Sequence, residues 1–178
     1  MDQSTAIKRF SQWDRQGRFV YTLADLAKLF PEDSPRALKD GLQRLVAEGL
    51  LERPVRGVYL YPLAHSCDSF TIESIARALR RGEYNYVSLE SALSEYGAIS
   101  QAPLDRLTVM TTGRKGVYKT PYGTIEFVHT KRPVAELLKR MKEVARPLRL
   151  ATLQAAWADL KRVGRNTHLV DRSVIDNE

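Results

Sequence analysis

The side chains that most often bind metals or act as nucleophiles are few in this sequence and lie far apart. The three histidines, His65, His129 and His168, are isolated from one another, and the single cysteine, Cys67, follows His65 by two positions. A structural zinc site needs four ligands, and a cysteine nucleophile needs a base that a third group holds in place. The surrounding segment supplies neither, so we expect no metal site here and no catalytic cysteine.

Acidic and hydroxyl side chains also form no catalytic set. Glu126 is followed by two apolar residues, whereas a nuclease-type acidic strand would place a lysine two positions on, and Lys131 is too distant. Ser88 and Ser91 could be considered as nucleophiles, but Ser88 stands where it would cap a helix, which accounts for its presence. Carboxylate pairs at general acid–base spacing are missing. The sequence therefore predicts no enzyme activity and no cofactor.

A different chemistry, the reading of a DNA duplex, has better candidates. From residue 35 to 47, polar side chains recur on the face opposite Leu38, Leu42 and Leu45, as expected for a helix at about 100° per residue. Such a helix can enter a major groove, where its side chains hydrogen-bond base edges or contact phosphates. The candidate DNA-binding residues are Ser34, Arg36, Lys39, Gln43, Arg44 and Arg56.

Two short helices are predicted to position these side chains. Thr22 and Asp25 have the spacing of a capping box at the start of the first helix, and residues 31–33 break it with a turn. Ser34 is a good N-cap for the second helix, because Pro35 then occupies its first position and Gly49 lies where it would end.

A hairpin is predicted to follow the second helix. Two β-rich runs, 50–55 and 58–61, are joined by the short turn Arg56-Gly57. Helix, turn, helix and a basic hairpin in this order are the winged-helix pattern, in which the second helix reads the major groove. The alternative is a packed helical hairpin with a two-stranded ribbon that binds nothing.

The charge of the chain favours a polyanionic partner and is unevenly distributed. The 178 residues carry a net charge of +7, and 43% of them are hydrophobic, as in ordinary globular proteins. Residues 131–165 hold ten lysines and arginines but only three acidic residues. We expect an outward-facing basic patch there, directed toward DNA or toward an acidic or RNA target, unless it is an ordinary solvated face. The patch comprises Lys131, Arg132, Lys139, Arg140, Lys142 and Arg146.

The environment of the chain can also be predicted. One cysteine excludes an internal disulfide and fits a reducing compartment. No run of about 18 apolar residues is present, and the N-terminus lacks the apolar core of a signal peptide. We expect a cytoplasmic protein without a membrane partner.

The sequence predicts an α+β protein of two domains. Residues 1–65 would form the winged helix, and residues 66–178 a small α+β domain with an antiparallel sheet. Its predicted strands are 107–111, 117–119 and 124–129, the last two joined by a turn at 121–123. Its predicted helices are 69–81, 88–97, a helix that opens at Pro133 with an apolar face running to Val144, and 152–163.

One stretch of the second domain resembles a known family. Residues 88–99, SLESALSEYGAI, are similar to the start of the second domain in the AbiEi family, the antitoxins of type IV toxin–antitoxin systems. The flanking order also matches: a winged helix ending in Arg56-Gly57-Val58-Tyr59 precedes the motif, and a strand, a basic loop and a hairpin follow it. A late helix, 151–159, ends in an aspartate as in that family. The resemblance covers about residues 20–170.

The resemblance implies a function. Proteins of this family bind operator DNA with inverted repeats through the winged helix and repress their own operon. Their second domain supports cooperative DNA binding and counteracts a nucleotidyltransferase-like toxin, with or without a stable complex. Two alternatives remain open from the sequence: a nucleic-acid-processing enzyme with a winged-helix targeting module, and a winged-helix regulator that senses a small ligand.

Overall fold

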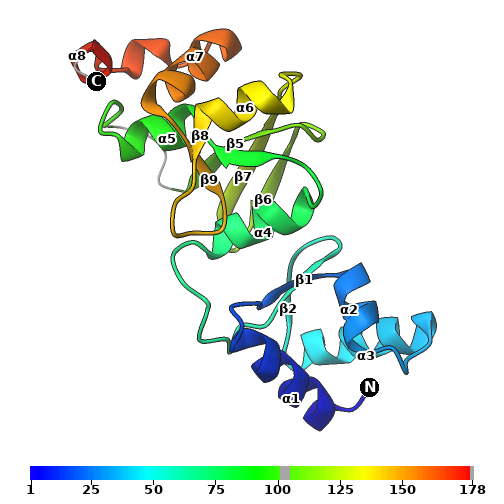
Figure 1. Cartoon of the computed structure of the whole chain (residues 1–178). Coiled ribbons are helices and arrows are strands. Elements are labelled where there is room, and N and C mark those ends of the chain that lie inside the picture. The colour runs from blue at the N-terminus through cyan, green and yellow to red at the C-terminus, as the bar shows by residue number, and fades with distance from the viewer. Residues whose placement is uncertain (101–104, 177–178) are drawn as a thin grey trace. The chain divides into compact units, whose positions relative to one another are not determined.

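Two compact units make up the chain, Met1–Leu79 and Arg80–Glu178, each with its own sheet and core (Figure 1). The computed structural model describes residues 1–100 and 105–176. The protein is α+β, as the sequence predicts. The sequence-based domain boundary lies after residue 65, whereas helix α4 (Thr71–Leu79) falls in the first unit. Among the helices of the described residues, none is both long and apolar enough to cross a bilayer.

The first unit combines four helices with a three-stranded antiparallel sheet in the order β1-β3-β2. Helix α4 packs on β1 and β3. The predicted hairpin is confirmed, since Val55 pairs with Val58 across the turn Arg56-Gly57. The elements are α1 (Gln3–Asp14), β1 (Val20–Thr22), α2 (Leu23–Leu29), α3 (Pro35–Ala47), β2 (Glu52–Val55), β3 (Val58–Leu60) and α4.

Aromatic rings form the centre of this unit's core. The ring centroid of Phe10, on α1, lies 5.4 Å from that of Tyr21, 5.8 Å from that of Phe30 and 5.5 Å from that of Tyr61. All four side chains are at most 5% exposed. Burial of such large rings is a major stabilising term, and here it fixes α1 and the end of α2 on the sheet.

The second unit is built on a six-stranded sheet in the order β6-β7-β5-β4-β9-β8. Helix α5 packs on α7 and on β5. The elements are β4 (Asn85–Val87), α5 (Leu89–Glu95), β5 (Arg106–Thr111), β6 (Gly116–Thr120), β7 (Gly123–His129), α6 (Val134–Arg140), β8 (Met141–Lys142), β9 (Arg149–Ala151), α7 (Leu153–Val163), the 3-10 helix η1 (Thr167–Leu169) and α8 (Arg172–Asp176).

The sheet of the second unit is mixed, so the prediction of an antiparallel sheet was wrong. Strands β5 and β7 pair in parallel, and so do β4 and β9. The turn after Thr120 makes β6 and β7 an antiparallel hairpin, as predicted. However, β7 inserts between β6 and β5, which makes β7 run parallel to β5. The local turn signal says nothing about this insertion.

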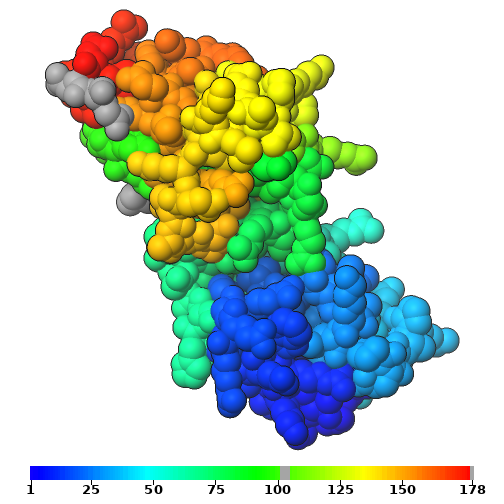
Figure 2. All heavy atoms as spheres, in the orientation of Figure 1, coloured from blue at the N-terminus to red at the C-terminus, as the bar shows by residue number. Residues whose placement is uncertain are grey.

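Helix α6 is shorter than predicted. It ends at Arg140, and the next two residues pair with β9 as strand β8 instead of extending the helix to Val144. Only Leu137 of this helix is buried, whereas Val134 is 41% and Leu138 is 49% exposed. Figure 2 shows this segment, in yellow, at the surface of the second unit. The predicted apolar face of the helix is therefore largely outside the core.

Candidate functional site

The residues proposed to read DNA lie on the exposed face of α3. Ser34, Arg36, Lys39, Gln43 and Arg44 are all exposed, and the apolar side chains of the opposite face are buried in the first unit. The helix begins as the sequence predicts: Ser34 is the N-cap, its Oγ accepts a hydrogen bond from the Ala37 amide at 3.2 Å, and a proline occupies the first turn.

The hairpin contributes one further cation from the same unit. Arg56 is exposed at the tip, and Gly57 beside it has a φ of +84°, the left-handed region that glycine adopts without strain. On α3, Arg44 is also engaged locally, because its Nη2 donates to the Met1 carbonyl at 3.3 Å. The structure thus presents a helix face and a hairpin tip, both cationic and solvent-accessible.

The basic patch predicted in residues 131–165 is dispersed. Lys131, Lys139 and Lys142 are exposed, and the ammonium of Lys142 lies 4.9 Å from the ring centroid of Tyr96. Arg146 forms a two-pronged ion pair with Glu95, at 2.8 and 2.9 Å. The prediction that all of these charges face outward was therefore wrong for Arg146, and it was also wrong for two further arginines.

Those two arginines, Arg132 and Arg140, converge on the carboxylate of Asp159, which is 0% exposed. Arg132 Nη1 and Arg140 Nη2 donate to its Oδ1 at 2.9 and 3.0 Å. Tyr86 Oη and Ser88 Oγ donate to its Oδ2 at 3.1 and 2.9 Å. Burial next to this carboxylate raises the pKa of Tyr86 above its ordinary value. Asp159 thus ties α7 to β4, to the start of α5 and to both ends of the α6 segment.

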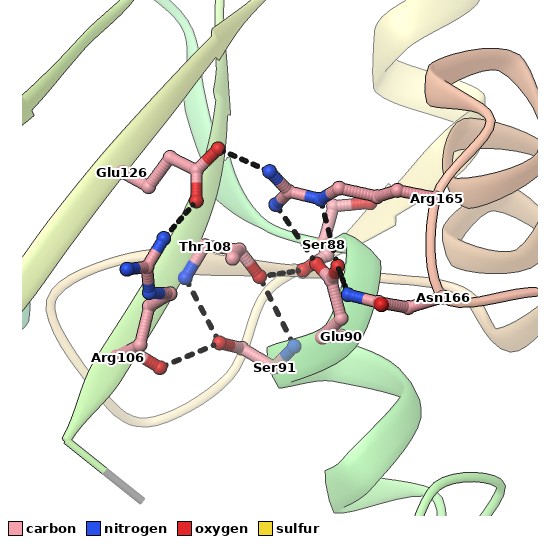
Figure 3. Close-up of polar contacts among 8 residues, drawn as sticks. All are labelled: Ser88, Glu90, Ser91, Arg106, Thr108, Glu126, Arg165 and Asn166. Atoms are coloured by element: carbon pink, nitrogen blue, oxygen red, sulfur yellow. Dashed lines mark hydrogen bonds and ion pairs between the residues drawn. The ribbon is translucent and has the colours of Figure 1, made fainter. Parts of the chain in front are cut away.

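The role of Ser88 differs from the sequence prediction. It occupies the N-cap position of α5, but its side chain makes no capping hydrogen bond. Instead, Thr108 Oγ1 on β5 accepts from the Ser91 amide at 3.0 Å and donates to the Ser88 carbonyl at 2.6 Å (Figure 3). A side chain from another element therefore satisfies the first turn of the helix, which leaves the Ser88 hydroxyl to bind Asp159.

The turn into α5 is also strained. Leu89 has a φ of +57°, a conformation that costs a bulky residue about 1–3 kcal/mol, and its side chain is 0% exposed. The hydrogen bonds of Ser88 and Ser91 on either side hold this conformation in place. The motif at residues 88–99 therefore begins with a strained turn that hydrogen bonds on both sides stabilise.

An ion-pair network continues from α5 to the loop after α7 (Figure 3). Arg165 contacts Glu90 through Nε at 2.8 Å and contacts Glu126 through Nη1. Glu126 also accepts from Arg106 Nη1 at 2.8 Å, and Asn166 donates to Glu90 at 2.9 Å. Burial alone would raise the pKa of Glu126, but the hydrogen bonds from Arg165 and Arg106 outweigh it and lower that pKa.

The residues considered for catalysis are spread over both units. His65 donates its backbone amide to Asp14, Cys67 Sγ lies 3.3 Å from Thr71 Oγ1, and His129 Nδ1 lies 2.8 Å from the Gly113 carbonyl. Within residues 1–100 and 105–176, no three histidine, cysteine, aspartate or glutamate side chains are grouped so that they could hold a metal ion.

Sequence reasoning missed the two clusters around Asp159 and Arg165. Their members come from positions as distant as Ser88 and Asp159, or Glu90 and Arg165, so no local spacing reveals them. One signal was available for the first cluster, because the family resemblance includes Asp159. The resemblance places this aspartate at the end of the late helix, whereas in the structure it lies within α7.

Comparison with known proteins finds a solved structure with a similar fold. No family model matches the chain, and no curated protein matches it. Among solved structures, the RV2827C protein from Mycobacterium tuberculosis is similar over 99% of this chain and 71% of its own, with a TM-score of 0.55 and 17% sequence identity. The α+β architecture therefore recurs in a second protein.

Proposed function

We propose that this protein is a DNA-binding antitoxin of the AbiEi type, which represses its own operon and counteracts a nucleotidyltransferase-like toxin. The observation that carries the proposal is that one unit exposes both the polar face of α3 and a cationic hairpin tip. In this proposal the first unit is a winged helix, α3 lies in the major groove and Arg56 contacts the phosphate backbone.

The dimensions of α3 support this role. Its 13 residues correspond to a length of about 20 Å. A major groove about 12 Å wide admits one such helix, and its exposed arginines and glutamine are the side chains that pair with guanine and adenine edges. Arg36 and Gln43 lie two turns apart on this face, so both can reach base edges within one half-site.

The motif that carries the family resemblance supports the second half of the proposal. Ser88, at its start, donates to Asp159, which ends the resembling part of the late helix. Two separate pieces of the resemblance thus meet in one buried contact.

A two-part experiment in cells tests the proposal. The chain is expressed together with a reporter under the promoter of its own gene, and separately together with a nucleotidyltransferase gene, which the proposal expects to lie next to its own. The proposal predicts repression of the reporter and restored growth. A reporter that stays fully active would refute the repressor role, and toxin-arrested growth that the chain does not relieve would refute the antitoxin role.

A further inference from the structure

The excess positive charge of the chain resides in the second unit. Residues 80–178 contain seventeen lysines and arginines against eleven acidic residues. Many of these arginines form ion pairs within the unit, as described above for the partners Asp159, Glu95 and Glu126. By contrast, Arg114, Lys115 and Lys131 are exposed, and no carboxylate of the described residues pairs with their side chains.

These three cations lie at the same end of the sheet, although they come from two segments. Arg114 and Lys115 follow β5, and Lys131 follows β7. Because β5 and β7 are parallel and their last residues, Thr111 and His129, are paired, both segments leave the sheet at one edge. The segments are also bonded to each other: His129 Nδ1 contacts the Gly113 carbonyl at 2.8 Å, and the Thr130 amide donates to the Thr111 carbonyl at 2.9 Å. We name Arg114, Lys115 and Lys131 the cationic edge.

The loop that carries Arg114 and Lys115 is held rigidly. Arg80 Nε donates to the Arg114 carbonyl at 2.8 Å, and the guanidinium of Arg80 lies 4.4 Å from the ring centroid of Phe127. The Gly113 amide donates to Thr111 Oγ1 at 3.0 Å. A Cβ on Gly113 would lie 2.9 Å from Glu83 Cγ and 3.0 Å from Arg80 Cδ, so a larger residue here would displace these side chains. A fixed backbone lowers the entropy cost of binding.

We propose that the cationic edge binds the phosphodiester backbone of a nucleic acid, at a surface separate from α3 and the hairpin. Three exposed cations on neighbouring segments match a row of regularly spaced phosphates better than one isolated phosphate. Glu83 is the acidic residue beside the loop, and its carboxylate accepts from Thr112 Oγ1. The edge remains net positive with Glu83 included. Because the proposed contacts are to phosphate oxygens, which are the same at every nucleotide, the binding is independent of sequence.

The test measures the salt dependence of binding by the full-length chain to two probes, a 30-base-pair duplex of random sequence and a 30-nucleotide single-stranded RNA. The test variant is the triple substitution Arg114→Ala, Lys115→Ala and Lys131→Ala. A matched control removes the same charge elsewhere in the unit, through Lys139→Ala, Lys142→Ala and Lys161→Ala. Circular dichroism checks that both variants fold.

Each lost phosphate contact should reduce the slope of log binding constant against log salt concentration. For the three substituted cations the total reduction should be up to about 2.7 with the duplex or about 2.1 with the single strand. The probe that shows the loss identifies the source of the backbone. The control should change the slope by less than half as much, and Lys115→Arg with Lys131→Arg should bind like the unsubstituted protein. An unchanged slope in the test variant, or equal losses in test and control, would overturn the proposal.

Operator preference is a separate measurement. If the unsubstituted protein showed no preference for its operator, the proposed function would be refuted, but the proposal for the cationic edge would not be affected.

Discussion

At the scale of single residues, Asp159 connects more of the second unit than any motif suggests. Its two carboxylate oxygens accept from two arginines, a tyrosine and a serine, while its side chain is fully buried. A buried carboxylate is costly unless it is paired and hydrogen-bonded, and here both conditions hold. Removal of its charge would leave Arg132 and Arg140 without their shared partner.

We predict that Asp159→Asn destabilises the protein by about 3 kcal/mol, because it breaks a buried ion pair on one side only. Urea unfolding followed by circular dichroism measures the change. The control is Glu143→Gln, which removes a carboxylate that is 77% exposed and paired with Arg149. That change should stay within about 0.5 kcal/mol. Equal effects of the two substitutions would contradict the assigned role of Asp159.

The lowered pKa of Glu126 gives a prediction for acid stability. Since Arg165 and Arg106 hold the pKa of Glu126 below its ordinary value, folding favours the ionised form. The contribution of Glu126 is fully present above the pKa of the unfolded carboxyl group. It is lost as the pH falls through the lower pKa of the folded state.

Comparison of the unsubstituted protein with Glu126→Gln tests this linkage. The urea concentration at the unfolding midpoint should be lower for Glu126→Gln than for the unsubstituted protein. This difference should be largest at neutral pH and should become smaller as the pH falls below the ordinary carboxyl pKa. Glu143→Gln again serves as the exposed control, with a small gap throughout. A gap for Glu126→Gln that stays constant with pH would exclude a charge-dependent role.

At the scale of elements, local signals predicted the structure where the partner is a near neighbour in sequence. The capping box of Thr22 and Asp25, the N-cap at Ser34 and the two-residue turn at Arg56-Gly57 are all present. Each of these features depends on residues within a few positions of one another.

Prediction failed where a distant residue decides the local structure. The cap of α5 comes from Thr108 and not from Ser88, and β7 inserts beside β5, so neither feature is encoded in a local pattern. Helix α6 ends early because Met141 and Lys142 pair with β9. The basic segment looked like a patch because its acidic partners, such as Glu95, lie far from it in the sequence.

The third prediction concerns the proposed roles of α3, which would read bases, and of the hairpin, which would contact phosphates. Gln43→Ala or Arg36→Ala should weaken operator binding by about 1–3 kcal/mol and relax base preference at one position. Arg56→Ala should weaken binding to all sequences alike and lower the salt slope by about 1. Gel-shift titrations against operator and single-base variants measure both effects.

Lys139→Ala, on α6 of the second unit, is the control for these titrations, since it removes an exposed cation outside α3 and the hairpin. Operator affinity that is unaffected by Arg36→Ala and Gln43→Ala would show that α3 does not read DNA.

At the scale of the whole molecule, two units with different chemistry share one chain. The first presents a polar helix face and a hairpin tip, and the second has a mixed sheet with two internal charge clusters and an exposed cationic edge. The sequence predicted the α+β class, and the residues proposed to bind DNA are exposed in the structure. It could not locate the exposed charge of the second unit, because each arginine's partner is set by tertiary structure.

Repression of a specific operator is the central claim, and a titration of the purified full-length chain against its own promoter tests it most directly. The comparison is between a duplex that carries the inverted repeats and a duplex of the same length and composition with the repeats scrambled, at one stated salt concentration. The proposed function predicts at least about a thousandfold tighter binding to the repeats. Equal affinity for the two duplexes would contradict it.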